Sequence, residues 1–232
     1  MAALAIIDST NVPRGVDLWV VTLADTDIVT KKMLKKTEDL TRYEQIIPQK
    51  RRRHFLFRRV VRDFVLGQYV TNYAVEKDAA GKPYVIAQES QHRIHFSASS
   101  SAEICVIGVS GEELGVDVES RRQHVDMVGI CERFVPGFAQ IKNQFGIECL
   151  LRQLAMCAWC RIESFVKLRG HTLHAMLLEK EELMSGWLQQ SHHTDVVVSA
   201  RDYVCAISQA NPFDIRNIYT INFSNIHCEH GD

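Results

Sequence analysis

The sequence has no long apolar run and no excess of charge of either sign. Asp8, Arg14 and Asp17 interrupt the first 21 residues, which therefore form neither the core of a signal peptide nor the roughly 20 apolar residues of a membrane span. Lys and Arg number 27 against 28 Asp and Glu, a formal net charge of -1, so no overall field attracts nucleic acid or an anionic membrane. We therefore expect a cytoplasmic protein without nucleic-acid or membrane partners.

The cysteines lack the even number and regular spacing of a disulfide framework. There are seven, an odd number scattered along the chain, as expected for reduced and mostly buried thiols. Cys157 and Cys160 form a C-x-x-C, and residues 227–230 read His-Cys-Glu-His, so a zinc- or redox-dependent protein is one alternative. The C-x-x-C lies in the apolar stretch LLRQLAMCAWC, however, which favours a buried helix, and residues 227–230 have no second ligand pair at zinc-site spacing.

The order of predicted helices and strands lacks the regular alternation of a doubly wound parallel sheet, which favours an α+β protein. A strand is predicted at 17–23, a polar and partly helical segment at 31–45, and an arginine-rich amphipathic helix after Pro48. Strands follow in RIHFSAS, ICVIGVS and LGVDVES, then helices at 128–134 and 149–168 and strands at 195–200 and 203–208. The order strand, long helix, strands occurs twice, which suggests two halves.

The segment LGVDVES places two acids on a predicted strand. Asp117 and Glu119 are two residues apart and project from one face, while Val116 and Val118 point to the other. Two adjacent carboxylates repel each other unless a cation neutralises them, and Mg²⁺ commonly binds one or two carboxylates together with phosphate oxygens. The alternative is an exposed edge strand with two solvated acids.

The segment WCRIESFVKLRG carries an aromatic, acidic and basic stripe. Trp159, Glu163 and Lys167 are four residues apart and lie on one side of the predicted helix. Glu163 is a candidate third metal-directed carboxylate, next to a lysine that would meet phosphate. The alternative is an ordinary Glu-Lys pair on a helix surface.

Two further segments carry basic side chains that are candidates for binding phosphate. They are the arginines Arg53, Arg58 and Arg62, the last two four residues apart on one helix face, and the turn GKP at 81–83. Guanidinium and ammonium groups suit phosphate oxygens, although basic helix faces are also commonly just solvated.

Taken in order, these segments resemble the 4'-phosphopantetheinyl transferases of the type that activates surfactin synthetase. The resemblance covers residues 40–208 and consists of the basic helix, GKP, HFSASSS, LGVDVES and WCRIESFVK, with GVDVE and 159–167 as its strongest parts. It implies a pseudo-dimer of two similar α/β halves with the active site in the cleft between them. Residues 1–112 would contact the coenzyme A nucleotide and the carrier protein, and residues 113–232 would carry the metal-binding acids and the catalytic helix.

The resemblance also implies an activity, a cofactor and partners. The enzyme would move phosphopantetheine from coenzyme A to a serine of an acyl, peptidyl or aryl carrier protein of fatty-acid, polyketide or nonribosomal-peptide synthesis. Adenosine 3',5'-bisphosphate would leave, Mg²⁺ or alternatively Mn²⁺ would neutralise the pyrophosphate, and a monomer would suffice. Glu163, directly or through a metal-bound water, would take the serine proton.

Site residues carry over by motif position. The metal ligands would be Asp117, Glu119 and Glu163. The catalytic group would be Glu163, Asp117, Glu119 and Lys167. The coenzyme A contacts would be Arg53 near the 3'-phosphate, Arg58, Lys82, Pro83, Ser99, Ser100, Asp117 and Lys167.

Two positions depart from the family pattern. Ser100 stands where the family has a histidine that touches phosphate, and Ile162 stands where it has a lysine before the helix glutamate. Each change removes a side chain that can donate a hydrogen bond to phosphate. We therefore expect the substitution Ile162→Lys, which restores the lysine of the family pattern, to tighten coenzyme A binding. A catalytically impaired family member that binds carrier protein or coenzyme A without transfer is therefore the alternative function.

Overall fold

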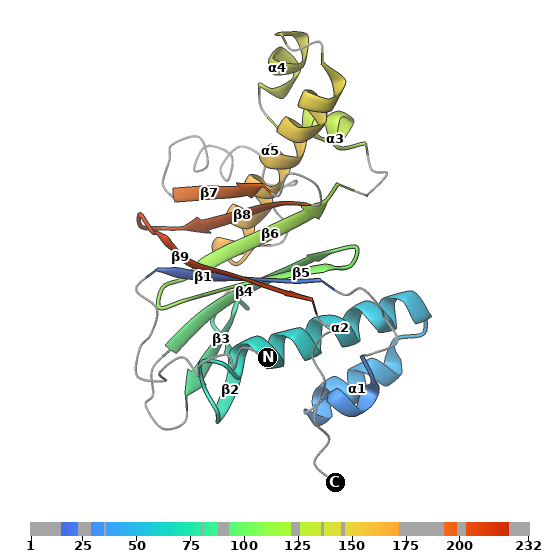
Figure 1. Cartoon of the computed structure of the whole chain (residues 1–232), viewed down its shortest axis with the longest axis vertical. Coiled ribbons are helices and arrows are strands. Elements are labelled where there is room, and N and C mark those ends of the chain that lie inside the picture. Colours follow the sequence, from blue (N-terminus) through green and yellow to red (C-terminus); the bar gives the residue numbers. More distant parts are fainter. Residues whose placement is uncertain are drawn as a thin grey trace.

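The chain is an α+β protein in which two sheets pack against each other between two sets of helices (Figure 1). The computed structural model describes residues 15–22, 29–34, 36–79, 81–87, 93–121, 126–135, 137–144, 147–171, 193–198 and 203–222. None of the helices within these ranges combines the length and the apolar character needed to cross a membrane.

The first sheet has six strands in the order β2-β3-β4-β5-β1-β9. They are β1 (Val16–Thr22), β2 (Tyr73–Lys77), β3 (Pro83–Ala87), β4 (Arg93–Ser101), β5 (Ile104–Ser110) and β9 (Ile215–Asn222). Neighbours are antiparallel except β1 and β9, which run parallel. Helices α1 (Thr37–Gln45) and α2 (Gln49–Leu66) lie on its outer face, where Trp19 and Val21 share a core with Val61 and Val65.

The second sheet has three antiparallel strands, β6 (Leu114–Ser120), β8 (Tyr203–Gln209) and β7 (His193–Val198). Helix α5 (Glu148–Leu168) packs on it, with α3 (Met127–Phe134) and α4 (Phe138–Gln144) beyond (Figure 1). The approach of α5 requires glycine at position 115, because a Cβ there would lie 1.9 Å from the carbonyl oxygen of Ser164. This close packing brings the side chains of α5 next to those of β6.

Apolar side chains fill the space between the two sheets. Val16, Leu18 and Val20 of β1 meet Val116 and Val118 of β6, so the valines of LGVDVES point into the core as predicted. Since side chains alternate along a strand, the acids of β6 face the opposite way, toward α5.

The structure confirms the helices predicted at 128–134 and 149–168 and the basic amphipathic helix, but it also contains elements that were not predicted. These are β2, β3, α4 and β9. Strand β9 comes from the last part of the chain yet pairs with β1, so the first sheet includes a strand from beyond the expected boundary at residue 112.

Candidate functional site

A row of serines on β4 holds the edge strand β6 in place. Ser97 Oγ accepts a hydrogen bond from the amide of Val116 at 2.9 Å, and Ser101 Oγ accepts one from the amide of Ser120 at 3.0 Å. The serines thus serve as partners for an edge strand whose other side pairs with β8. This arrangement places the acids of β6 beside both β4 and α5.

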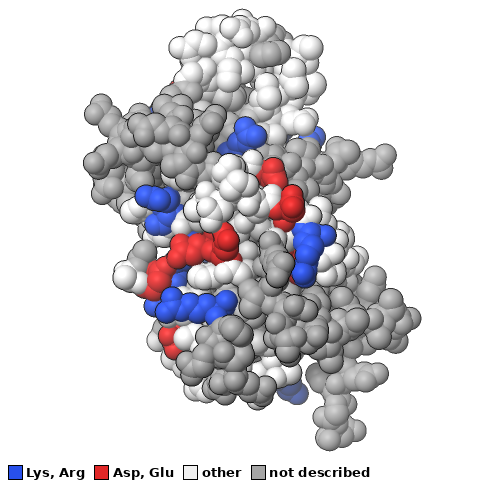
Figure 2. Space-filling view, turned by 90° about the vertical axis from the view of Figure 1, so that its left-hand side faces the viewer, with Lys and Arg blue, Asp and Glu red and all other residues white. Residues whose placement is uncertain are grey.

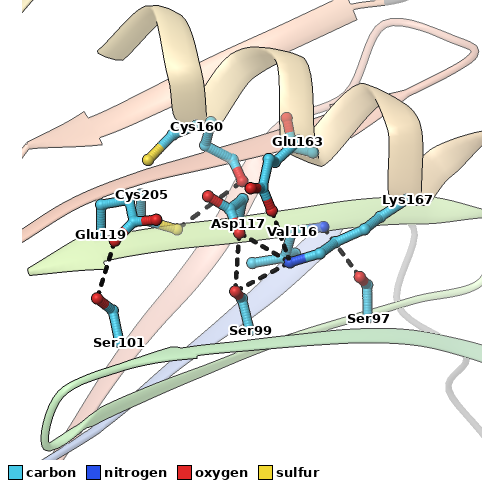
Figure 3. Close-up of polar contacts among 12 residues, drawn as sticks. Ser97, Ser99, Ser101, Val116, Asp117, Glu119, Cys160, Glu163, Lys167 and Cys205 are labelled. Atoms are coloured by element: carbon cyan, nitrogen blue, oxygen red, sulfur yellow. Dashed lines mark hydrogen bonds and ion pairs between the residues drawn. The ribbon is translucent and has the colours of Figure 1, made fainter. Parts of the chain in front are cut away.

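Asp117, Ser99 and Lys167 form the centre of the site (Figure 3). Lys167 Nζ lies 2.7 Å from Asp117 Oδ1 and donates to Ser99 Oγ at 2.9 Å, while Ser99 Oγ donates to Asp117 Oδ1 at 2.8 Å. Lys167 Nζ is also 3.9 Å from Glu163 Oε2. The structure therefore assembles side chains from β4, β6 and α5 that the sequence analysis had selected separately.

Two acids of this site are held in an environment that favours their protonated form. Burial, and then the neighbouring Asp117 carboxylate, raise the pKa of Glu163 to about 7, although Lys167 acts in the opposite direction. Burial, followed by Asp117, also raises the pKa of Glu119, while the hydroxyl of Ser101, which donates to Glu119 at 2.9 Å, lowers it. A carboxyl group that titrates near neutral pH can both accept and return a proton.

Asp117 is 2% exposed, so the alternative of an exposed edge strand with solvated acids does not describe it. Its Oδ2 atom is buried and has no hydrogen-bond partner within the described residues. A buried carboxylate oxygen without a partner is energetically costly, which makes it a candidate ligand for a cation or a hydrogen-bond acceptor for a ligand.

The expected three-carboxylate metal site is not assembled in the described part of the chain, where no group of three or more His, Cys, Asp and Glu side chains is positioned to hold a metal ion. Glu119 hydrogen-bonds to Ser101 (Figure 3), and the ammonium group of Lys167 contacts Asp117. Asp117, with its unpartnered oxygen, and the adjacent Glu163 fit the smaller carboxylate set that Mg²⁺ commonly uses.

A cleft of about 1110 Å³ opens beside this cluster. Its walls come from α1, α2, the β2-β3 hairpin, β4 and the end of α5. The cleft therefore lies where the first sheet and its helices meet α5, the helix that carries Glu163 and Lys167. Among the residues singled out from sequence, its lining includes Arg58, Arg62, Lys82, Pro83, Ser100 and Lys167. The cleft therefore gathers residues from positions as far apart as 58 and 167 around one space.

The position of each arginine around the axis of α2 determines whether it lines this cleft. Arg51, Phe55, Arg58 and Arg62 recur at helical spacing and line it, whereas Arg53 lines a separate cavity of about 420 Å³. Sequence reasoning chose Arg53 by motif position and missed Arg51, although the helical period of the same stretch could have separated them. Lys77 and His171, which also line the cleft, had no sequence signal.

The cations of the cleft differ in whether an acidic side chain already pairs with them. Arg62 is buried and bonds to Asp39 at 2.8 Å, and it also pairs with Asp63. By contrast, no described residue forms a hydrogen bond or an ion pair with Arg51, Arg58 or Lys77. These three side chains remain available to an anionic ligand.

The charge of the surface is local. On the face in Figure 2, basic and acidic side chains lie next to one another across the middle, and the upper part is mostly uncharged. On this face, therefore, no extended patch of a single charge is visible, in agreement with a net charge of -1.

The structure places Ile162 in the hydrophobic core and not at the cleft. The side chain is 1% exposed and packs in the core between α5 and the second sheet. A lysine there would bury an unpaired charge instead of reaching the cleft, so the structure gives no reason to expect Ile162→Lys to tighten coenzyme A binding. Ser100, in contrast, does line the cleft.

The cysteines behave as expected for structural thiols. Cys160 is buried in the core of α5 and donates to the carbonyl of Val204, and burial raises the pKa of Cys160, Cys131 and Cys105. Cys157 and Cys160 lie in the predicted helix as free thiols, and residues 227–230 fall outside the described residues. Within the described parts nothing links the C-x-x-C to a metal site.

In comparisons with known proteins, no family model and no curated protein matches the chain significantly.

Proposed function

We propose that this chain transfers 4'-phosphopantetheine from coenzyme A to a serine of an acyl, peptidyl or aryl carrier protein. The observation that supports this most is the cleft of about 1110 Å³, because it is lined by cations without a described partner and by Lys167, whose Nζ lies 2.7 Å from Asp117 and 3.9 Å from Glu163. Ligand sites typically occupy about 300 to 1,000 Å³, so a ligand as long as coenzyme A is compatible with this volume. The two layers of sheet and helix would correspond to the two halves of the transferase pseudo-dimer.

The cations of the cleft would bind the phosphates of coenzyme A. Arg51, Arg58 and Lys77 have no described partner and line the cleft from α2 and β2, while Lys167 lines it from α5. Arginine forks and lysine ammonium groups form charge-assisted hydrogen bonds to phosphate oxygens. Ser100 adds a hydroxyl donor to the same cleft.

Glu163 is our candidate general base. Its pKa near 7 lets it take the proton of the carrier serine at neutral pH, as the serine oxygen forms a bond to the phosphorus on the pantetheine side. The bond between that phosphorus and the bridging oxygen of the pyrophosphate breaks, and adenosine 3',5'-bisphosphate leaves with the electron pair. Lys167 would stabilise the charge that develops on the phosphate oxygens.

Magnesium would be held by Asp117, whose Oδ2 has no described partner, and when bound it would supply charge neutralisation for the pyrophosphate.

Intact-mass spectrometry of an apo carrier protein tests the proposal. The carrier is incubated with this protein, coenzyme A and Mg²⁺, in parallel with a reaction without the metal and one without the protein. We expect the mass of the carrier to increase by one phosphopantetheine group in the complete reaction alone. Unmodified acyl, peptidyl and aryl carriers throughout would contradict the transferase function.

Ser100 favours a second candidate, a protein that binds coenzyme A or a carrier without transfer. A hydroxyl in the cleft supplies no positive charge where the family resemblance implies a histidine. Calorimetric binding of coenzyme A together with an unchanged carrier mass would support this candidate over the enzyme.

A further inference from the structure

The last turn of α5 ends in a compact cap in which the carbonyl of Leu168 has no backbone partner among the described residues. Gly170 has a φ of +70°, its amide donates to the carbonyl of Lys167 at 3.2 Å, and the amide of His171 donates to that of Val166 at 3.1 Å. These two bonds form the usual glycine-terminated cap of a helix. The carbonyl of Leu168 takes part in neither bond.

Lys82, from the other layer of the molecule, supplies the missing partner. Its Nζ donates to the carbonyl oxygen of Leu168 at 3.0 Å, and its side chain is 7% exposed. A cation at this point also opposes the partial negative charge at the C-terminus of the helix. Glu113 Oε2, 3.5 Å away, is its only acidic neighbour among the described ion pairs.

The turn between β2 and β3 fixes Lys82 in this position. The amide of Lys82 donates to Asp78 Oδ1 at 2.8 Å, and the amide of Asp78 donates to the Lys82 carbonyl at 3.0 Å. Gly81, with a φ of +84°, closes the turn. The lysine is therefore presented to α5 by a hydrogen-bonded loop.

We propose that Lys82 is a positioning residue that fastens the end of α5 to the β2-β3 turn and so sets the place of Lys167 and Glu163 beside the cleft. Lys167 directly precedes Leu168, and Glu163 lies four residues earlier on the same helix. A shift of the helix end therefore moves both side chains relative to Asp117. The catalytic consequence rests on the proposed transferase function, whereas the fastening itself does not.

The positioning role of Lys82 differs from that of a side chain that binds the phosphate of a ligand. Lys82 lines the cleft, but its ammonium group is buried and bonded to a carbonyl, whereas Lys77 on the same hairpin is exposed and has no described partner. Removing a side chain that binds phosphate weakens ligand binding, while moving a catalytic group lowers the reaction rate of the enzyme-substrate complex.

Steady-state kinetics of Lys82→Met, Lys82→Arg and the matched control Lys77→Met separate the two roles. For Lys82→Met we expect kcat to fall about 10- to 100-fold with little change in the KM for coenzyme A, because a small misplacement of a reacting group has a large kinetic cost. Lys82→Arg, which keeps a donor, should recover most of kcat, and Lys77→Met should raise KM alone. A raised KM with unchanged kcat in Lys82→Met would overturn the proposal.

Amide hydrogen exchange tests the fastening without any substrate. The amides of Gly170 and His171 should exchange at least about 10-fold faster in Lys82→Met than in the native protein and in Lys77→Met, because the cap loses its anchor. If Lys82→Met does not fold, Lys82→Ala, which also lacks a donor, serves in the same comparison. Native exchange rates in a folded variant without a donor at position 82 would contradict the proposal even if the protein proved to be no transferase, and faster exchange would support the fastening in that case.

Discussion

Two buried aspartates, Asp17 in β1 and Asp117 in β6, differ in how completely their neighbours satisfy them. Asp17 is 0% exposed and accepts hydrogen bonds from Tyr69 Oη at 2.9 Å and Asn217 Nδ2 at 2.9 Å. The guanidinium group of Arg216 adds two more, at 3.2 and 3.1 Å. Both oxygens of Asp17 are thus engaged, and the bonds join β1 to β9 and to the segment after α2.

Asp117 is equally buried but only half satisfied. Ser99 and Lys167 both contact Oδ1, while Oδ2 has no partner among the described residues. Two further acids with raised pKa values, Glu119 and Glu163, lie beside it. In Asp17 a full set of donors offsets the cost of burial, whereas in Asp117 part of that cost remains for a ligand to offset.

The comparison predicts first that Asp17→Ala has the largest effect on stability. Removing this carboxylate leaves the Arg216, Tyr69 and Asn217 donors without their shared acceptor, which should lower the free energy of unfolding by about 3 to 5 kcal/mol. Chemical denaturation measures the loss. A change below 1 kcal/mol would mean that the network does not hold β9 against β1.

Asp117→Asn should have the opposite profile. We expect the initial rate of carrier modification to fall at least about 100-fold, because the group that orients Lys167 loses its charge. The free energy of unfolding should change by no more than about 1 kcal/mol, since a lost ion pair and a relieved repulsion act in opposite directions. Activity near the native level would place the reaction outside this cluster.

Glu163→Gln should remove a dependence of stability on pH. The pKa of Glu163 is raised from 4.5 to about 7, so the folded protein binds more protons than the unfolded chain between these values. The native protein should therefore lose stability as pH rises from 4.5 to 7, and the variant should lack about 3 kcal/mol of this loss. Denaturation curves at pH 4.5, 6 and 8 measure it, and parallel curves for both proteins would contradict the raised pKa.

Tyr69→Phe should lower stability less than Asp17→Ala and leave activity unchanged. The hydroxyl donates to Asp17 and accepts from Trp19 Nε1 at 2.8 Å, so its loss removes two buried hydrogen bonds while the other donors to Asp17 remain. We expect the free energy of unfolding to fall by about 1 to 2 kcal/mol, with unchanged coenzyme A affinity. A fall as large as that of Asp17→Ala would show that the network acts as one unit.

The sequence predicts the parts of the fold and the site that depend on local patterns. Period-two alternation placed Val116 and Val118 in the core, and helical spacing placed Glu163 and Lys167 on one stripe. It could not predict that β9 pairs with β1, because a parallel neighbour some 200 residues away leaves no local signal.

The same limit applies to individual side chains of the site. The sequence motif cannot tell that Ile162 faces the core or that Lys82 bonds to the end of α5, since both depend on how the two layers pack. The contrast between Arg51 and Arg53 was accessible from the helical period alone.

The measurement that most directly tests the central claim is a calorimetric titration of coenzyme A into the native protein and into Lys167→Met, with Lys142→Met as a control of equal charge. Lys142 pairs with Glu132 away from the cleft. We predict saturable binding that weakens at least about 10-fold in Lys167→Met and stays native in Lys142→Met, because a charge-assisted bond to phosphate is lost only in the first. The absence of binding to the native protein, or equal affinity in both variants, would contradict the claim that this cleft and its acid-lysine cluster receive coenzyme A.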